Sequence, residues 1–280
     1  MKKIVIGNIE YESFDGITKL FKKFIFNPLL NYVLPAEFLK KILANSKSDL
    51  AHESLVDPGN WKSMKLSYEN NPPKDFLDKM VLRYGSFPAG LRNRKKLVVS
   101  MLSSLIKRYK NQDNILIVGV GAGRGFNAMD SIVTSGLKNV EGYFIDIDDS
   151  AMEPGRALAE SLGLSDKIKF IQGNAIDLKK HIPKNADILK LIGIIEYLTD
   201  AQVSEILNVG YENMNKGSTV IVNSIEPAHG IDPFLRKTFG LKLIYRTAEQ
   251  VKKLLEKSNF SVLEDAKEPL DIYHIITAVK

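Results

Sequence analysis

The glycine-rich stretch ILIVGVGAGRGFNAM, residues 115–129, constrains the fold of this chain more than any other feature. Its leading apolar run, 115–118, is bounded by glycine, which is typical of a strand buried on both faces of a parallel sheet. Gly119, Gly121 and Gly123 then let the backbone turn sharply and approach a ligand without a Cβ in the way. The helix predicted from Phe126 would direct its free N–H groups at a negative group. We therefore expect a polar ligand at the end of this strand, with a glycine-rich turn of another α/β domain as the alternative.

An acidic residue ends the next predicted strand. Tyr143–Ile145 form the strand, and Asp146 follows it 23 residues after Gly123. A carboxylate at this distance and at a strand end is suited to accept hydrogen bonds from ribose hydroxyls. The dinucleotide fingerprint requires a glycine where this chain has Arg124, so the pattern favours S-adenosylmethionine over a dinucleotide.

Further motifs follow in an order that resembles class I S-adenosylmethionine-dependent methyltransferases over residues 113–280. IDIDDSAMEPGRALAESLGL is similar to the second strand and helix of that family, IKFIQGNAIDL to its third strand and adenine loop, and ADILKLIGIIEYLTD to its fourth strand and active-site loop. NMNKGSTVIVNSIEP resembles its fifth strand, and residues 246–280 resemble its closing helix and antiparallel hairpin. The resemblance implies an α/β, Rossmann-like, seven-stranded sheet of order 3-2-1-4-5-7-6, with the seventh strand antiparallel.

The same resemblance implies S-adenosylmethionine as the cofactor and assigns its contacts. The glycine loop would pass beneath the methionine portion, and Asp146 would bind the ribose. Family members often have an acidic residue where this chain has Asn174, so the adenine contact becomes an amide or backbone one. The predicted cofactor residues are Gly119, Gly121, Gly123, Asp146, Ile147, Asn174, Ala175 and Gly193.

The fourth-strand loop would determine the chemistry. Glu196 could deprotonate an acceptor or bind its ammonium group, and Tyr197 could line the path of the methyl group. His229 follows the fifth strand at the ligand-binding edge and is a candidate general base. Glu226, in the same segment, is a candidate substrate-binding residue. Each has a purely structural alternative: Glu196 as an acid at a helix start, Tyr197 as a packed tyrosine and His229 as a surface histidine. Asp200 is expected to cap the next helix.

Composition excludes several classes of function. The 280 residues include no cysteine, so a disulfide framework, a thiolate metal site and a cysteine nucleophile are excluded. The apolar run near the N-terminus is too short for the core of a signal peptide, and no apolar run is long enough to span a membrane. We expect a soluble cytoplasmic protein, and no dense carboxylate–histidine cluster indicates a metal.

Charge and pattern divide the chain into three expected parts. Residues 1–82 would form a helical, basic cap or substrate domain, 83–112 a connecting helix, and 113–280 the cofactor domain. Residues 1–112 have a net charge of +10, whereas residues 113–280 have −4. This asymmetry indicates either an anionic partner or solvated lysines. Arg92 and Arg94 at the connecting helix could bind a carboxylate of cofactor or substrate, or could be solvated.

An amphipathic helix is predicted over residues 14–32. Its apolar residues recur at spacings of three and four, with lysines between them. The stripe could pack on the next helix, which is its ordinary use, or it could form a lid over a hydrophobic acceptor or a membrane-surface helix. Its leading members are Phe14, Ile17, Phe21, Phe24 and Ile25.

The favoured function is methyl transfer to an oxygen, nitrogen or carbon nucleophile of a small molecule, anionic or hydrophobic. Alternatives are aminocarboxypropyl transfer of the nicotianamine-synthase type, RNA methylation, and a non-catalytic scaffold that binds cofactor or a membrane surface. Nucleic acid is not an expected partner, because no N-P-P-Y or D-P-P-Y loop follows the fourth strand. The oligomeric state stays open, a homodimer included.

Overall fold

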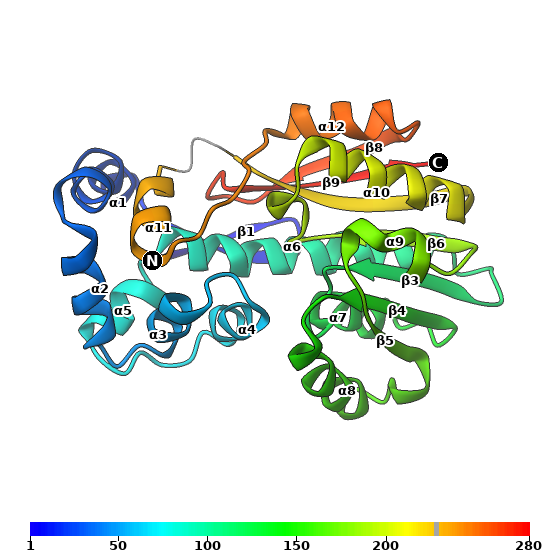
Figure 1. Ribbon diagram of the computed structural model, residues 1–280, viewed down its shortest axis with the longest axis horizontal. Helices are drawn as coiled ribbons and strands as arrows, with labels where there is room; N and C mark the ends of the chain where they lie inside the picture. Colours follow the sequence, from blue (N-terminus) through cyan, green and yellow to red (C-terminus); the bar gives the residue numbers. More distant parts are fainter. Residues whose placement is uncertain (227–229) are drawn as a thin grey trace. The chain divides into compact units, whose positions relative to one another are not determined.

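The computed structural model describes residues 1–226 and 230–280, and Figure 1 shows their helices and strands along the chain. The chain divides into two compact units. The first comprises Met1–Lys96, Glu226–Leu243 and Lys267–Tyr273, and the second comprises Leu97–Ile225, Ile244–Ala266 and His274–Lys280.

A seven-stranded sheet organises the second unit. Its spatial order is β5-β4-β3-β6-β7-β9-β8, which is 3-2-1-4-5-7-6 when the strands are numbered within the sheet. This confirms the predicted fold. The strands are β3 (Ile115–Val120), β4 (Val140–Asp146), β5 (Ile168–Gln172), β6 (Ala186–Leu191), β7 (Met214–Ile225), β8 (Ser261–Lys267) and β9 (Tyr273–Val279).

Strand direction also follows the prediction. β3 pairs in parallel with β4 and β6, and β4–β5 and β6–β7 are parallel as well. β9 is antiparallel to β7, because Gly217 near the start of β7 bonds to Lys280, whereas Glu226 after its end bonds to Ile272. The carboxyl ends of β3 to β7 therefore meet at one edge, where open α/β sheets bind ligands.

Helices flank this sheet and build its core. Figure 1 shows α7 and α8 beside β4 and β5, and α10 and α12 beside β7 and β9. Strand residues such as Val118 and Leu189 are fully buried against residues of these helices, among them Leu207 and Leu255. The helices are α7 (Phe126–Ser135), α8 (Met152–Ser161), α9 (Leu178–His181), α10 (Asp200–Asn213) and α12 (Ala248–Lys257).

The first unit combines short helices with a hairpin that the sequence reading did not predict. β1 (Lys2–Ile6) pairs antiparallel with β2 (Ile9–Ser13), and Gly7 makes the two-residue turn possible through its φ of +59°. The helices are α1 (Gly16–Phe21), α2 (Ala36–Ala44), α3 (Asp49–Val56), α4 (Trp61–Glu69), α5 (Phe76–Leu82) and α11 (Asp232–Phe239). None of the helices in the described ranges is long and apolar enough to cross a membrane.

Residues 16–33 are helical throughout, but their orientation corrects the ordinary interpretation of the apolar stripe. α1 continues into two π-helical segments, Lys22–Phe26 and Leu29–Val33. Phe14 is buried, whereas Ile17, Phe21, Phe24 and Ile25 are all exposed. These side chains are therefore not packed on the next helix, and the residues that the segment buries are Lys22 and Asn31.

The long helix α6 (Ser86–Arg108) begins in the first unit and ends in the second. One side of its second half is apolar and buried, at Leu97, Met101, Leu105 and Ile106. Its last turn leads through a short loop directly into β3, so the helix fixes the start of the glycine-bearing strand.

Candidate active site

The glycine loop after β3 adopts conformations that glycine accommodates best. Gly121, Gly123 and Gly125 have φ values of +61°, +53° and +72°. A Cβ on Gly121 would also lie 2.8 Å from the Cβ of Ile194, closer than real side chains approach. The loop can thus turn tightly between the ends of β3 and β6 only because these positions lack side chains.

Asp146 joins the end of β4 to this loop. Its Oδ2 accepts from the Gly123 N–H at 2.5 Å, and its Oδ1 accepts from the Asp148 N–H at 2.9 Å. Each carboxylate oxygen keeps further lone pairs for a ligand. The residue predicted to bind a ribose is therefore held in a fixed orientation against the predicted methionine loop. Asp148 caps the short helix that follows, through the Ser150 N–H.

The loops after β4 and β5 contain the residues predicted near adenine. The Asn174 side chain accepts from the Ile176 N–H at 3.2 Å, so it caps the turn 175–177, and Ala175 is buried. Ile147 and Ile176 are large apolar side chains exposed after adjacent strands. The sequence reading missed Ile176, although an apolar residue beside a predicted adenine loop could have indicated it.

The end of β6 is fixed by a buried amide on the neighbouring strand. The Gly193 N–H donates to Asn223 Oδ1 at 2.7 Å, and Asn223 is fully buried on β7. Among the described residues its Nδ2 has no hydrogen-bond partner. A buried donor without a partner is uncommon in folded proteins, and this one lies near the ligand-binding edge of the sheet. Asn223 was not predicted, because a lone asparagine in a strand has no distinctive sequence signal.

Glu196 and Tyr197 lie together in the short 3-10 helix after β6. Glu196 is 4% exposed, whereas Tyr197 is 45% exposed. The Glu196 carbonyl accepts from the Ile244 N–H at 2.7 Å, which ties the loop to the segment before α12. One buried acid and one accessible phenol at this edge are suited to act on an acceptor.

Arg246 fixes this loop through its buried side chain and is a third residue that sequence reasoning missed. Its guanidinium is buried and donates to the carbonyls of Ile195 and Leu198, both at 2.7 Å. Its Nε also donates to Asp200 Oδ1 at 2.8 Å. Asp200 is therefore a partner of Arg246. The predicted cap is wrong: Thr199 caps α10 through the Gln202 N–H, in a capping box.

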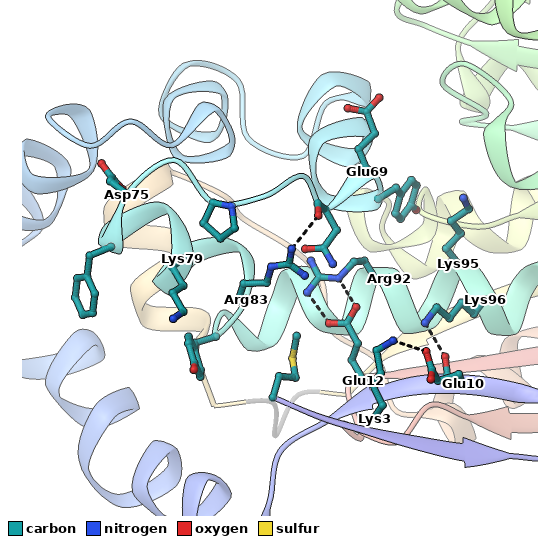
Figure 2. Close-up of a pocket in the computed structure, with 16 residues that line it drawn as sticks. Lys3, Glu10, Glu12, Glu69, Asp75, Lys79, Arg83, Arg92, Lys95 and Lys96 are labelled. Atoms are coloured by element: carbon teal, nitrogen blue, oxygen red, sulfur yellow. Dashed lines mark hydrogen bonds and ion pairs between the residues drawn. The ribbon is translucent and has the colours of Figure 1, made fainter.

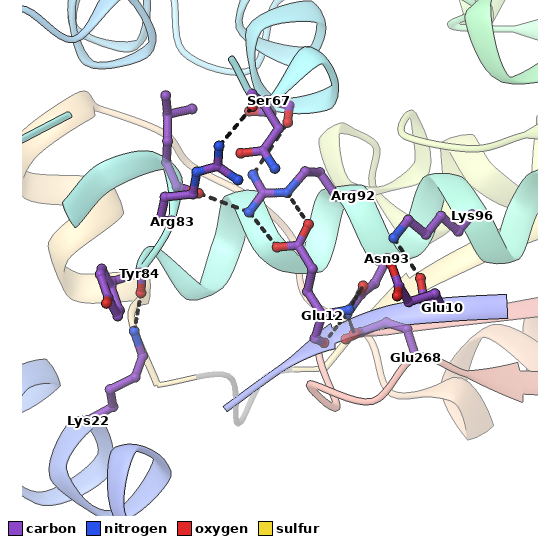
Figure 3. A network of polar contacts seen from close by, with 12 residues as sticks. Glu10, Glu12, Lys22, Ser67, Arg83, Tyr84, Arg92, Asn93, Lys96 and Glu268 are labelled. Atoms are coloured by element: carbon purple, nitrogen blue, oxygen red, sulfur yellow. Dashed lines mark hydrogen bonds and ion pairs between the residues drawn. The ribbon is translucent and has the colours of Figure 1, made fainter. Parts of the chain in front are cut away.

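Arg92 has its donors engaged within the first unit. Nε and Nη2 each bond a carboxylate oxygen of Glu12 at 2.6 Å, and Nη2 also reaches the Leu82 carbonyl. Figure 3 shows this pair together with Asn93. The geometry thus gives no support to the predicted role of Arg92 in binding a ligand carboxylate.

Asn93 extends the network. It bonds the Glu12 backbone and the Glu268 carboxylate, which is completely buried. Burial raises the pKa of Glu268, while hydrogen bonds from Asn93 and three backbone N–H groups oppose the rise. The network thus connects the hairpin, α6 and the 268–273 segment.

A cavity of about 890 Å³ opens beside Arg92 in the first unit (Figure 2). Two ion pairs lie in its lining. Arg92 pairs with Glu12 at 2.6 Å, and Lys3 pairs with Glu10 at 2.7 Å. Arg94 does not line it; its Nη2 lies 3.2 Å from the Tyr68 hydroxyl and its guanidinium 4.8 Å from the centre of the Tyr273 ring. The carboxylate-binding role of Arg94 stays a prediction.

Two predicted residues lie around the segment after β7. Glu226 belongs to the first unit, where its N–H donates to the Ile272 carbonyl at 2.9 Å. His229 lies outside the described residues. Within residues 1–226 and 230–280, histidine and acidic side chains form no group of three able to hold a metal ion.

The family comparison gives the decisive observation. Residues 67–274 match the model of a family described as "Putative methyltransferase", which covers more than half of the chain. The chain belongs to this methyltransferase family. Together with the sheet order, this confirms the prediction of a class I S-adenosylmethionine-dependent methyltransferase, and S-adenosylmethionine is the cofactor that family and fold imply. No curated protein matches the methyltransferase.

Solved structures similar to the methyltransferase support the fold. A possible exported protein from Bordetella parapertussis is 17% identical, with 86% of each chain covered and a TM-score of 0.70. Magnesium protoporphyrin IX methyltransferase from Synechocystis PCC 6803, with bound S-adenosylhomocysteine, is 13% identical over 86% of this chain and 99% of that chain, with a TM-score of 0.59. A riboflavin-derivative dimethyltransferase from Streptomyces davawensis is 13% identical over 83% and 70%, with a TM-score of 0.51.

Proposed function

We propose that this methyltransferase transfers a methyl group from S-adenosylmethionine to an oxygen, nitrogen or carbon nucleophile of a small molecule. The observation that supports it best is the Asp146 carboxylate, bonded to the Gly123 N–H at the end of adjacent strands. Similar structures include enzymes named for a porphyrin and a riboflavin derivative, which supports a small-molecule acceptor.

The residues at the sheet edge fit the cofactor. The positive-φ glycine loop leaves backbone groups accessible beside Asp146, which would hold the ribose. Exposed Ile147 and Ile176 would contact the adenine, and the Gly193 backbone would contact the methionine portion. When bound, S-adenosylmethionine supplies a methyl group activated by a positively charged sulfur.

The protein's contribution to the reaction is positioning and proton removal. Glu196 is buried and would accept the acceptor's proton or bind its ammonium group, while the exposed Tyr197 would contact the acceptor. Arg246 positions both by fixing the carbonyls of Ile195 and Leu198. Correct alignment of a nucleophile can supply much of the rate of such a displacement. His229 stays a predicted general base.

The test is calorimetric titration with S-adenosylmethionine and S-adenosylhomocysteine, with Asp146→Asn compared against Asp149→Asn. Asp146→Asn removes the charge and should weaken binding about 10- to 100-fold, the usual range for a lost hydrogen bond to a charged group. Asp149 is exposed three residues on, so Asp149→Asn should bind both ligands like wild type. Equal affinities in the two variants would contradict the assigned site.

The reaction type is then read from products. Incubation with S-adenosylmethionine and fractionated metabolite pools should release S-adenosylhomocysteine in a fraction-dependent manner. Release of methylthioadenosine instead would indicate aminocarboxypropyl transfer and overturn the proposal, even if the cofactor site is correct.

A further inference from the structure

The helix 16–33 exposes a continuous apolar face. Eight large side chains on it are between 38% and 82% exposed. They recur every three or four residues, and several of them are adjacent in sequence, such as 20 and 21 or 24 and 25. This spacing places them along one side of a helix. We call them the outer stripe: Ile17, Leu20, Phe21, Phe24, Ile25, Leu29, Tyr32 and Val33.

The two residues that this helix buries are polar and already bonded. Lys22 is 8% exposed, lies 4.4 Å from the centre of the Phe14 ring and donates to the Tyr84 carbonyl (Figure 3). Asn31 donates to the Gly230 carbonyl at 2.8 Å and accepts from the Phe234 N–H at 3.1 Å. The helix is therefore fixed to its own unit by polar groups, with the apolar stripe outward. This is the reverse of an ordinary surface helix.

The positive charge of the helix restricts the kind of partner that could cover the outer stripe. From Gly16 to Leu34 the sequence contains three lysines and no acidic residue. Lys19 and Lys23 are exposed on the helix, and the Lys23 ammonium lies 5.4 Å from the centre of the Phe24 ring. A partner that covers the outer stripe must therefore be apolar and must also accept positive charge at its surface.

Two other occupants fit less well. The stripe runs along several helical turns, from residue 17 to 33, which is more than a small acceptor covers. A second copy of the same helix would add three further lysines to the contact and no acidic residue. An anionic lipid surface satisfies both requirements, because helices with aromatic and leucine residues on one face and lysines beside them lie in the membrane interface.

We propose that the helix 16–33 docks the methyltransferase on an anionic lipid surface. The outer stripe enters the interfacial region, and Lys19 and Lys23 contact the headgroups. The helix lies on the bilayer and does not span it, which agrees with the lack of a membrane-spanning helix in the described residues. This inference goes beyond methyl transfer and does not depend on it.

The test is cosedimentation of the full chain with vesicles of phosphatidylcholine alone or with about 30% phosphatidylserine, an anionic lipid. Wild type should bind the anionic vesicles and lose binding as salt rises. Phe24→Ser should lower the partition coefficient about tenfold, and the Lys19→Gln/Lys23→Gln double variant by about fivefold per lysine.

Matched controls come from the same unit. Phe76 is an exposed phenylalanine on α5 and Lys47 is an exposed lysine, so Phe76→Ser and Lys47→Gln should bind vesicles like wild type. Far-UV circular dichroism and S-adenosylmethionine affinity should stay unchanged in every variant, since the altered side chains are exposed.

Three outcomes would overturn the proposal. They are no binding to anionic vesicles, equal binding to neutral vesicles, and equal losses in Phe24→Ser and Phe76→Ser. Sedimentation velocity without lipid covers the remaining alternative. A dimer that Phe24→Ser converts to monomer, without lipid binding by wild type, would assign the stripe to contact between copies. None of these results would affect the proposed methyl transfer.

Discussion

Replacement of Gly125 by alanine should destabilise the second unit by clash as well as by backbone strain. Gly125 is the N-cap of α7 with a φ of +72°, and an added Cβ would lie 2.7 Å from two carbons of the Phe144 ring. Phe144 cannot easily move, because it is buried and packs edge-on against Phe170 at 5.5 Å. Left-handed strain costs about 1–2 kcal/mol and overpacking about 1–3 kcal/mol, so the free energy of unfolding should fall by roughly 2–5 kcal/mol.

Gly136 provides the matched control on the same helix. It is the C-cap of α7 with a φ of +73°, but an added Cβ would meet nothing within 4 Å. Gly136→Ala should therefore cost only the backbone strain of about 1–2 kcal/mol. The difference between the two variants isolates the contact with Phe144.

Urea unfolding followed by far-UV circular dichroism measures both variants against wild type. A further variant, Phe144→Leu, removes the ring that the added Cβ would contact. Gly125→Ala should therefore lower the free energy of unfolding by less in that background than in wild type. The reasoning is refuted if Gly125→Ala is no more destabilising than Gly136→Ala, or if Phe144→Leu leaves its cost unchanged.

Two further predictions concern buried cations. Arg246→Met should lower kcat at least tenfold with little change in S-adenosylmethionine affinity, because the carbonyls of Ile195 and Leu198 lose the guanidinium that donates to them. Arg156→Met, which removes an exposed ion pair with Glu153, is the control, and an unchanged kcat in Arg246→Met would contradict a role for Arg246 in the site. Burial lowers the pKa of Lys22 from 10.5 to about 8. The unfolded chain then binds more protons between those values, so stability relative to Lys22→Met should rise by up to about 3 kcal/mol as pH increases through that window; parallel pH profiles of unfolding would contradict this.

The sheet could be predicted because its signals are local. The run 115–118 before glycine and the acid at 146 each sit within a few residues of the element they define. β1 and β2 also had a local signal, since Gly7-Asn8 directly before the alternating run Ile9–Ser13 is typical of a two-residue hairpin. Thr199 with Gln202 likewise matches a capping box and predicts the cap that was assigned to Asp200.

The contacts of the arginines could not be predicted in the same way. Arg92 meets Glu12 across 80 residues of sequence, and Arg246 meets the Ile195 carbonyl across 51. A guanidinium binds a protein carboxylate and a ligand carboxylate with the same geometry, so residue type alone does not separate the two roles. The helix 16–33 shows the same limit, because its period gives the apolar side but not the direction in which that side faces.

The Asp146 carboxylate shows how the fold prepares the cofactor site. Fixing a flexible carboxylate at the moment of binding costs conformational entropy. Here the Gly123 and Asp148 N–H groups already hold one oxygen each, so that cost falls on folding instead of on cofactor binding. The Gly123 N–H reaches Asp146 because the loop turns at positive φ. The same turn brings the Gly125 backbone so close to the Phe144 ring that a Cβ would not fit between them. Gly125→Ala should therefore weaken cofactor affinity as well as stability, whereas Gly136→Ala, at the far end of α7, should leave the affinity unchanged.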